Sequence, residues 1–239
     1  MGKNLIQQAR GRGGPTYRSP SFRFAGEISH HPFTNPTETI TGTIAELLKC
    51  PGHSAPLMRV LYADGICTLQ SAPEGVRVGE QVAIGPGADI KPGNTLTLSY
   101  IPEGTLIYNI ENQPGDGGRF CRAGGTFARV ISRTDKNVTI LLPSKKQKIL
   151  LANCRATVGI IAGAGREEKP LLRAGSAYWK HRAKNKLYPR IAGNAQNAVD
   201  HPFGKGRSHK KGRPTIAPAN APPGANVGKL RPRRTGFKR

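Results

Sequence analysis

Asp200 and His201 are neighbouring residues whose side chains could carry out acid–base chemistry. Histidine exchanges protons near neutral pH, so a His beside a carboxylate could serve as a general acid or base. The sequence places no nucleophile or third group beside them, and consecutive side chains do not generally point at each other. We therefore interpret Asp200 and His201 as residues that hydrogen-bond a binding partner or fix the turn before Pro202.

The cysteines are the other candidates for chemistry. Cys50, Cys67, Cys121 and Cys154 are separated by 17, 54 and 33 residues, so no CxxC pair is present. Cys50 and His53 have the local spacing of zinc ligands, but no second pair matches them. We interpret all four as reduced cysteines and expect no metal ion and no cofactor; a site that uses distant ligands is the alternative.

Basic residues are concentrated at the two ends of the chain. The 239 residues include 37 Lys or Arg and 14 Asp or Glu, giving a net charge of +23. Residues 1–37 carry +4, residues 38–162 carry +3 and residues 163–239 carry +16. Such a charge predicts a polyanionic partner, and it favours RNA or DNA over a membrane surface. There is no apolar run of about 18 residues and no apolar signal core, so we expect neither a membrane span nor export.

Residues 163–239 have the composition of an extension that does not fold alone. They contain 10 Gly and 8 Pro in 77 residues. Their charges are interleaved with aromatic residues, as in the run from Tyr178 to Arg182, and aromatic rings can stack on unpaired bases. A solvated linker is one interpretation; an extension that threads between RNA helices is the one we favour.

The middle of the chain predicts a mostly β fold. Short apolar runs alternate with Gly and Pro, and Asp64-Gly65 is a hairpin turn signal. Residues 95–98 could alternatively form a short helical turn. The spacing favours two small barrels over one large sandwich, and small barrels commonly bind nucleic acid. One short helix is expected within 167–184. The expected strands are 39–47, 56–62, 66–70, 81–84, 95–98, 105–110, 126–132, 137–142, 147–151 and 155–160.

The octamer Asn197-Ala-Val-Asp-His-Pro-Phe-Gly204 resembles the signature of the universal large-subunit ribosomal protein two family, in its archaeal and eukaryotic style. Nine further motifs of this chain resemble the same family in order, so the resemblance covers essentially the whole sequence. They are Ser54-Ala-Pro-Leu, Ala72-Pro-Glu-Gly-Val, Pro92-Gly-Asn-Thr-Leu, Ile101-Pro-Glu-Gly-Thr, Pro114-Gly-Asp-Gly-Gly, Asn153-Cys-Arg-Ala-Thr-Val-Gly, Glu168-Lys-Pro, Ala221-Pro-Pro-Gly and Arg234-Thr-Gly.

The resemblance implies a fold and a function. Residues 1–37 would be a basic N-terminal extension, 38–103 an oligonucleotide-binding (OB)-type β-barrel, 104–165 an SH3-like β-barrel and 166–239 a basic C-terminal extension. The protein would be a structural component of the large ribosomal subunit in the cytoplasm, not an enzyme. It would bind 23S-type rRNA, support subunit association and help place tRNA near the peptidyl transferase centre.

The resemblance also implies a set of partners and contact residues. The partners would be large-subunit rRNA, neighbouring ribosomal proteins and the small subunit at the intersubunit face, with no membrane and no small-molecule substrate. The residues that we predict to contact rRNA are Arg10, Arg12, Tyr17, Arg18, Arg23, Arg119, Arg122, Arg155, Arg166, Lys169, Arg173, Trp179, Lys180, His181, Arg182, Lys184, Lys186, Arg190, Asn197, Asp200, His201, Lys205, Arg207, Lys210, Lys211, Arg213, Lys229, Arg231, Arg233 and Arg234.

Several single positions differ from the family pattern. These differences concern individual contacts and leave the resemblance along the chain intact. Ala192 stands at a usual Arg, Lys205 interrupts a run of glycines, Trp179 replaces a usual His, Tyr188 replaces a usual Trp, Lys145 replaces a hairpin Gly, and Phe203 stands where bacterial members have a second His.

Two other classes of protein compete with this interpretation. A free nucleic-acid-binding module, such as a translation factor or a DNA-compacting protein, would usually need a sequence-reading helix, and none is evident. A membrane-surface protein would need an amphipathic helix with a clear apolar face, which the Gly and Pro of both extensions disfavour. Sedimentation of tagged protein from a lysate separates these classes, since a ribosomal component migrates with the large subunit through a high-salt wash.

Overall fold

The computed structural model describes residues 6–32, 38–197, 199–201, 203–204, 222 and 224–225. Two compact units make up the chain. We call Ser21–Pro170 the β unit, and Met1–Pro20 together with Leu171–Arg239 the terminal unit. Charge divides the sequence after residues 37 and 162, whereas spatial contacts divide it after Pro20 and Pro170.

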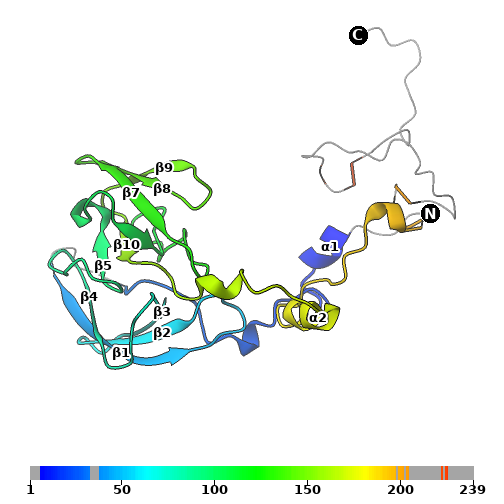
Figure 1. Cartoon of the computed structure of the whole chain (residues 1–239), viewed down its shortest axis with the longest axis horizontal. Coiled ribbons are helices and arrows are strands. Elements are labelled where there is room, and N and C mark those ends of the chain that lie inside the picture. Colours follow the sequence, from blue (N-terminus) through cyan, green and yellow to red (C-terminus); the bar gives the residue numbers. More distant parts are fainter. Residues whose placement is uncertain are drawn as a thin grey trace, which may run out of the picture. The chain divides into compact units, whose positions relative to one another are not determined.

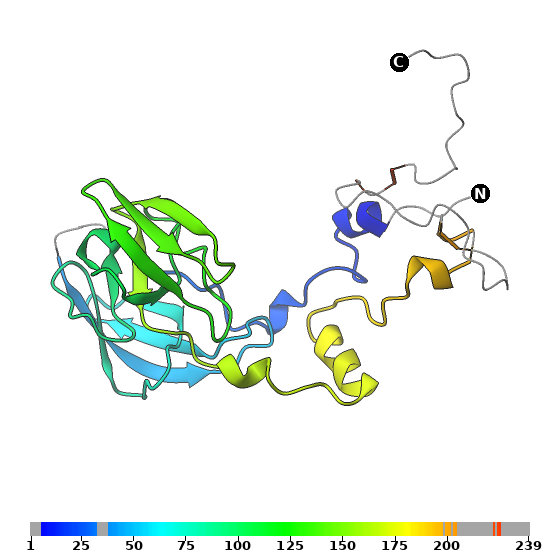
Figure 2. The ribbon, with the colours of Figure 1, turned by 45° about the horizontal axis from the view of Figure 1, so that its top comes forward.

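The β unit is built from short strands, which confirms the prediction of a mostly β chain. Each of the ten predicted strand ranges overlaps one strand in the described part of the chain. Figures 1 and 2 show β1–β3 on one side of this unit and β7–β9 on the other. The strands are β1 (Ile40–Leu48), β2 (Leu57–Tyr62), β3 (Cys67–Ser71), β4 (Gln81–Ile84), β5 (Thr95–Thr97), β6 (Leu106–Tyr108), β7 (Ala128–Arg133), β8 (Asn137–Leu141), β9 (Gln147–Leu151) and β10 (Arg155–Val158).

The strands pair in the order β3-β2-β1-β4-β5-β10-β6-β7-β8-β9. Neighbouring strands are antiparallel except β4 and β5, which meet in parallel at Ile84 and Thr95. Strand β10 lies between β5 and β6, although it follows both in the sequence. Residues 98–100 continue β5 as a short 3₁₀ helix (Leu98–Tyr100), so the stretch that predicted either a strand or a helical turn forms one after the other.

Two large apolar clusters and two smaller ones stabilise the β unit. Strands β1–β4 bury one cluster around Ile44, Val60 and Ile84. A larger cluster runs from Ala88 to Val158 and gathers apolar side chains of β5–β10. Alternation along the strands produces this burial, because every second side chain of a strand points to the same face.

Turn residues fix the hairpins between the strands. At the β2–β3 turn the Ile66 N–H donates to Asp64 Oδ1 at 3.0 Å, and Gly65 has a φ of 83°. At the β8–β9 turn the Lys145 N–H donates to the Leu142 carbonyl at 2.9 Å. Lys145 has a φ of 62°, the left-handed conformation that favours glycine at this place in a three-residue hairpin loop.

Helices are few in the part of the chain that the structure describes. The terminal unit contains α1 (Ile6–Gly11), α2 (Ala174–Arg182) and a 3₁₀ helix (Gly193–Ala195). Besides Leu98–Tyr100, the β unit contains 3₁₀ helices at Ser21–Arg23 and Ala164–Arg166. Helix α2 lies within residues 167–184, where the sequence predicts a helix, whereas α1 was not predicted. Among the described residues, the helices are too short or too polar to cross a bilayer.

Candidate nucleic-acid interface

Charge is distributed very unequally between the two units. The terminal unit contains 21 basic residues and one acidic residue, Asp200, a net charge of +20. The β unit contains 16 basic and 13 acidic residues, a net charge of +3. An excess of unneutralised cations is the electrostatic requirement for binding a polyphosphate backbone.

Most of the predicted contact residues described in the terminal unit have exposed side chains. Tyr17, His181, Lys184 and His201 are partly buried, and Trp179 is 62% exposed. The charged groups of the exposed residues are therefore available to a partner. The exposed cations are Arg10, Arg12, Arg18, Arg173, Lys180, Arg182, Lys186 and Arg190.

Helix α2 combines cations with aromatic rings and buries no residue. The Tyr178 and Trp179 rings meet edge to face, with centroids 5.4 Å apart. The Arg182 guanidinium lies 5.9 Å from the Tyr178 centroid and 5.1 Å from that of Trp179. Lys180, His181 and Arg182 occupy the last turn, where positive charge stabilises the helix dipole. Because α2 has no apolar face to bury, its surface is suited to polar and stacking contacts.

Asn185 ends α2 and connects the two ends of the chain. Its backbone is left-handed, with a φ of 48°, and the Lys186 N–H donates to the His181 carbonyl at 2.9 Å. Together with the bond from the Asn185 N–H to the Arg182 carbonyl at 3.0 Å, this forms a Schellman motif. The Asn185 side-chain amide donates to the carbonyls of Arg18 at 2.7 Å and Pro15 at 3.1 Å.

We did not predict this role of Asn185. An Asn directly after a basic helix end is a known C-terminal signal, so the helix cap was open to prediction. The connection to residues 15–18 was not, because the two segments are more than 160 residues apart in the sequence.

The Asn197–Gly204 signature forms tight turns. The Asn197 carbonyl accepts hydrogen bonds from the backbone N–H groups of Asp200 at 2.9 Å and His201 at 3.1 Å. His201 Nδ1 accepts one from the Phe203 N–H at 3.1 Å, and the two rings meet edge to face at 5.3 Å. Because Nδ1 is an acceptor, the proton of the neutral imidazole lies on Nε2. His201 therefore organises the turn around Pro202, which itself lies outside the described residues.

Two glycines allow the chain to pack closely around this turn. A Cβ at Gly193 would collide with the His201 ring, and a Cβ at Gly204 would collide with the Asn197 carbonyl oxygen. Ala192, which replaces a usual Arg, has extended backbone directly before the Gly193–Ala195 helix. The departure at 192 therefore changes a side chain beside the turn without changing its glycine.

The predicted contact residues of the β unit fall into two groups. Arg23, Arg119, Arg166 and Lys169 are exposed, and Arg166 pairs with Glu167 at 2.9 Å. Arg122 and Arg155 have internal partners instead. Arg122 donates to the carbonyls of Ile28 at 2.8 Å and Gly118 at 3.2 Å.

Arg155 is the centre of a buried polar network. Its side chain pairs with Glu111 through Nε at 3.0 Å and Nη2 at 2.7 Å, and its Nη1 donates to the His31 carbonyl at 2.8 Å. The Glu111 side chain is fully buried. Burial alone would raise the pKa of Glu111, but hydrogen bonds and charge from Arg155 outweigh burial and lower it. The Arg155 guanidinium therefore has partners within the protein, and its burial needs no contact with RNA.

His30 is buried beside this network. Its Nε2 lies 2.6 Å from the Asn109 carbonyl oxygen, so Nε2 carries the proton. Burial, followed by the charge of Arg155, lowers the pKa of His30 to about 4. The sequence interpretation did not identify this histidine as buried, because it lies in a stretch assigned to the basic N-terminal extension.

Cys50, Cys121 and Cys154 lie in or against apolar clusters of the β unit, whereas Cys67 is exposed. Cys50 packs in a cluster with Ile28 and Leu57, and its Sγ is 3.2 Å from His53 Nδ1. Among the described residues, no three His, Cys, Asp or Glu side chains gather in a metal-binding group. Burial raises the pKa of Cys121 to about 12 and that of Cys154 to about 11, so both are poor nucleophiles at neutral pH.

Nine predicted contact residues lie outside the described residues. They are Lys205, Arg207, Lys210, Lys211, Arg213, Lys229, Arg231, Arg233 and Arg234.

Comparison with known proteins decides the family. The family model described as "Ribosomal Proteins L2, C-terminal domain" matches residues 91–220. The large ribosomal subunit protein uL2 of Methanocella arvoryzae is 48% identical over 236 residues, covering 99% of each chain. The uL2 of Methanothermobacter thermautotrophicus is 48% identical over 241 residues, covering 100% of each, and that of Methanopyrus kandleri 45% identical over 238 residues, covering 99% of this chain and 98% of the relative.

The chain belongs to the uL2 family of large ribosomal subunit proteins. It is a structural ribosomal protein of the archaeal type and not an enzyme. This confirms the predicted family and the prediction that the protein is not an enzyme. Asp200 and His201 therefore do not form an enzyme's active site. The matched range 91–220 begins before β5 and includes the whole signature, so residues of both units take part in the match.

Proposed function

We propose that this uL2 protein binds 23S-type rRNA mainly through its terminal unit. The observation that carries the proposal is the contrast between +20 on the terminal unit and +3 on the β unit. The exposed cations and aromatic rings of α2 support it, because phosphate contacts supply affinity and rings stack on unpaired bases. In this proposal the protein acts in the cytoplasm, within the ribosome.

The finer fold is part of the same proposal. Residues 38–103 form an OB-type barrel and residues 104–165 an SH3-like barrel, with extensions at 1–37 and 166–239. The two largest apolar clusters of the β unit are separate from each other, which supports two barrels. The larger cluster includes Ala88, Leu96, Leu98 and Ile101, so part of its packing comes from residues before 104.

The proposed role at the ribosome is architectural. The protein supports subunit association, contacts neighbouring ribosomal proteins and the small subunit, and helps to place tRNA near the peptidyl transferase centre. The His201 turn supports an architectural role, since its imidazole hydrogen-bonds backbone and packs on Gly193. The C-terminal arm would carry this turn towards the RNA.

Two triple variants of the full-length protein test rRNA binding. One changes Arg173, Lys180 and Arg190 of the terminal unit to Gln; the other changes Lys49, Lys136 and Lys146, exposed cations of the β unit, to Gln. The measurement is the dissociation constant for full-length large-subunit rRNA across a series of salt concentrations. Each lost phosphate contact flattens the log–log salt slope by about 0.7–0.9.

The first triple should weaken binding and flatten the slope by about 2, whereas the second should leave the slope close to that of the wild type. Equal effects of the two triples would contradict a terminal-unit interface. Absence of salt-dependent binding by the wild type would contradict rRNA binding altogether.

A further inference from the structure

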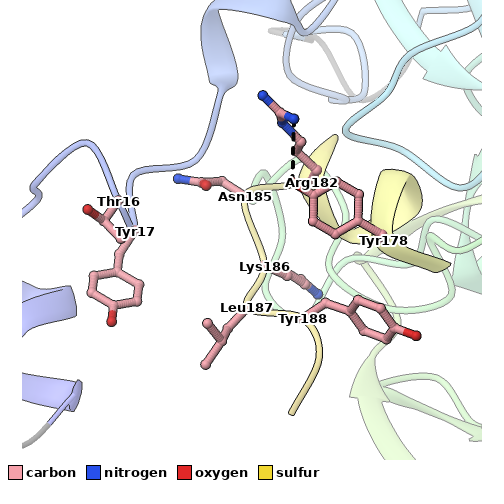
Figure 3. A pocket seen from close by; sticks show the side chains of 8 residues that line it. All are labelled: Thr16, Tyr17, Tyr178, Arg182, Asn185, Lys186, Leu187 and Tyr188. Atoms are coloured by element: carbon pink, nitrogen blue, oxygen red, sulfur yellow. Dashed lines mark hydrogen bonds between the residues drawn. The ribbon is translucent and has the colours of Figure 1, made fainter. Parts of the chain in front are cut away.

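The terminal unit contains a hollow of about 290 Å³. Figure 3 shows that Thr16 and Tyr17 come from the N-terminal segment, and that the other lining residues come from α2 and the segment after it. A volume of about 300 Å³ is at the lower end for pockets that hold small organic ligands. The hollow is lined by Thr16, Tyr17, Tyr178, Arg182, Asn185, Lys186, Leu187 and Tyr188.

Three tyrosines give the hollow flat aromatic surfaces. His181 stacks on Tyr188 with centroids 5.0 Å apart and planes 9° apart, which fixes the orientation of that ring. Tyr178 lies in the middle of α2 and is 40% exposed. The Arg10 guanidinium lies 5.5 Å from the centroid of Tyr17. Aromatic rings held in this way accept a nucleobase of any sequence, because every base has a π face.

Two cations complete the lining of the hollow. Arg182 donates to the Tyr178 hydroxyl at 3.4 Å, a long contact that leaves most of its guanidinium donors for a ligand. Among the residues that the structure describes, no carboxylate forms an ion pair with Arg182 or Lys186. A guanidinium can bind a phosphate through two parallel hydrogen bonds, and an ammonium binds it as a point charge.

Asn185 holds the two sides of the hollow together. Its amide bonds to the Pro15 and Arg18 carbonyls bracket Thr16 and Tyr17, and its left-handed backbone sets the path of residues 186–188. The site is therefore built from two distant segments that one residue joins.

We propose that this hollow binds a single unstacked nucleotide of RNA, with its base on the tyrosine rings and its phosphate on Arg182 and Lys186. The inference rests on the proposed rRNA-binding function and specifies one contact within it. Unpaired bases in loops and bulges are the elements of RNA that proteins capture by stacking. An uncharged apolar ligand would leave both cations unpaired, and an inorganic anion would leave the rings unused.

Ultraviolet cross-linking tests the proposal on the full-length protein bound to full-length large-subunit rRNA. At 254 nm a base stacked on a ring forms a covalent adduct, and mass spectrometry locates the adduct. We expect nucleotide adducts on Tyr17, Tyr178 or Tyr188. Tyr178→Leu should weaken rRNA binding about tenfold, the effect of losing one stacked base, and should remove the Tyr178 adduct.

Two further variants serve as controls. Tyr178→Phe keeps the ring and should bind within about twofold of the wild type, since stacking needs the π face and not the hydroxyl. Tyr100→Leu removes a tyrosine that is 54% exposed in the β unit and should not change the affinity.

The outcomes separate this inference from the function on which it rests. If the wild type binds rRNA tightly but no adduct falls on the three tyrosines, and Tyr178→Leu binds like Tyr100→Leu, the hollow does not bind a nucleotide. If the wild type does not bind rRNA at all, the proposed function fails and the inference fails with it.

Discussion

The β unit and the terminal unit differ in what stabilises them. The β unit buries two large apolar clusters, two smaller ones and a charged network, and its acidic and basic residues nearly balance. The terminal unit has a helix with no buried residue and a net charge of +20. Apolar burial must offset the conformational entropy of an ordered chain, and like charges repel one another.

This difference assigns the two units different sources of order. The free energy that folds the β unit comes from its own side chains, whereas in the proposed function the terminal unit gains order when RNA phosphates neutralise its charge. A change in the buried network should therefore alter unfolding of the β unit and leave in place the charges that we propose to bind rRNA. Three predictions test this separation.

The largest effect is expected from Glu111→Gln. The change leaves the Arg155 guanidinium buried without its carboxylate, and breaking a buried ion pair costs about 3–5 kcal/mol. Urea unfolding of the β unit measures the loss. The matched control is Glu167→Gln, which breaks the exposed pair with Arg166 and should cost about 0–1 kcal/mol. Equal losses in the two variants would show that the buried pair does not stabilise the β unit.

The pH dependence of stability should show the buried His30. Its folded pKa is about 4 and its ordinary value 6.5, so the unfolded chain takes up the proton first as pH falls. This contribution to stability is complete above about pH 6.5 and is lost as pH falls towards 4. At pH 5 the free energy of unfolding should be lower than at pH 7 by about 2 kcal/mol.

Urea unfolding at pH 7 and pH 5 checks this prediction. His30→Gln keeps a donor for the Asn109 carbonyl but cannot titrate, so its stability should fall less than that of the wild type between the two pH values. His181→Gln, a change in the terminal unit, should keep the dependence of the wild type. A wild type whose stability falls no more than that of His30→Gln would contradict a buried, neutral His30.

The smallest effect is expected from Lys145→Gly. Lys145 has left-handed backbone, which a side chain makes less favourable, so glycine should stabilise the β unit by about 0.5–1 kcal/mol. The midpoint of urea unfolding should rise while the affinity for rRNA stays the same. Lys146→Gly is the control and should not stabilise, since Lys146, whose carbonyl accepts from the Leu142 N–H, is not among the residues with left-handed backbone. Destabilisation by Lys145→Gly would mean that the lysine side chain makes a contact that outweighs backbone strain.

The strands of the β unit were predictable because local rules determine them. Alternating side chains and Asp-Gly, Pro and Gly turns identify a strand without knowledge of its partner. The sequence in which strands lie side by side in the sheet depends on contacts between distant residues, so the insertion of β10 between β5 and β6 was not predictable. For the same reason the burial of Arg155 against Glu111 could not be read from a sequence in which exposed and buried arginines look alike.

The candidate interface was predictable in composition but not in geometry. Charge and aromatic content identified the segment around Trp179, and the resemblance identified the turn at His201. The hollow was not predictable, because residues 16–17 and 178–188 are distant in the sequence and share no pattern. Asn185 acts through a left-handed backbone and a side-chain amide, neither of which composition reveals.

The position of β10 has a consequence for how the chain folds as it is made. Ala156 pairs with Leu96, a contact that spans 60 residues. Synthesis proceeds from the N-terminus, so β5 and β6 leave the ribosome well before the strand that joins them. Until β10 arrives, both present unpaired edges to other chains, and closure of a long loop must precede the pairing. Contacts of such sequence separation fold slowly, so the larger cluster of a protein destined for ribosomes is completed late in its own translation.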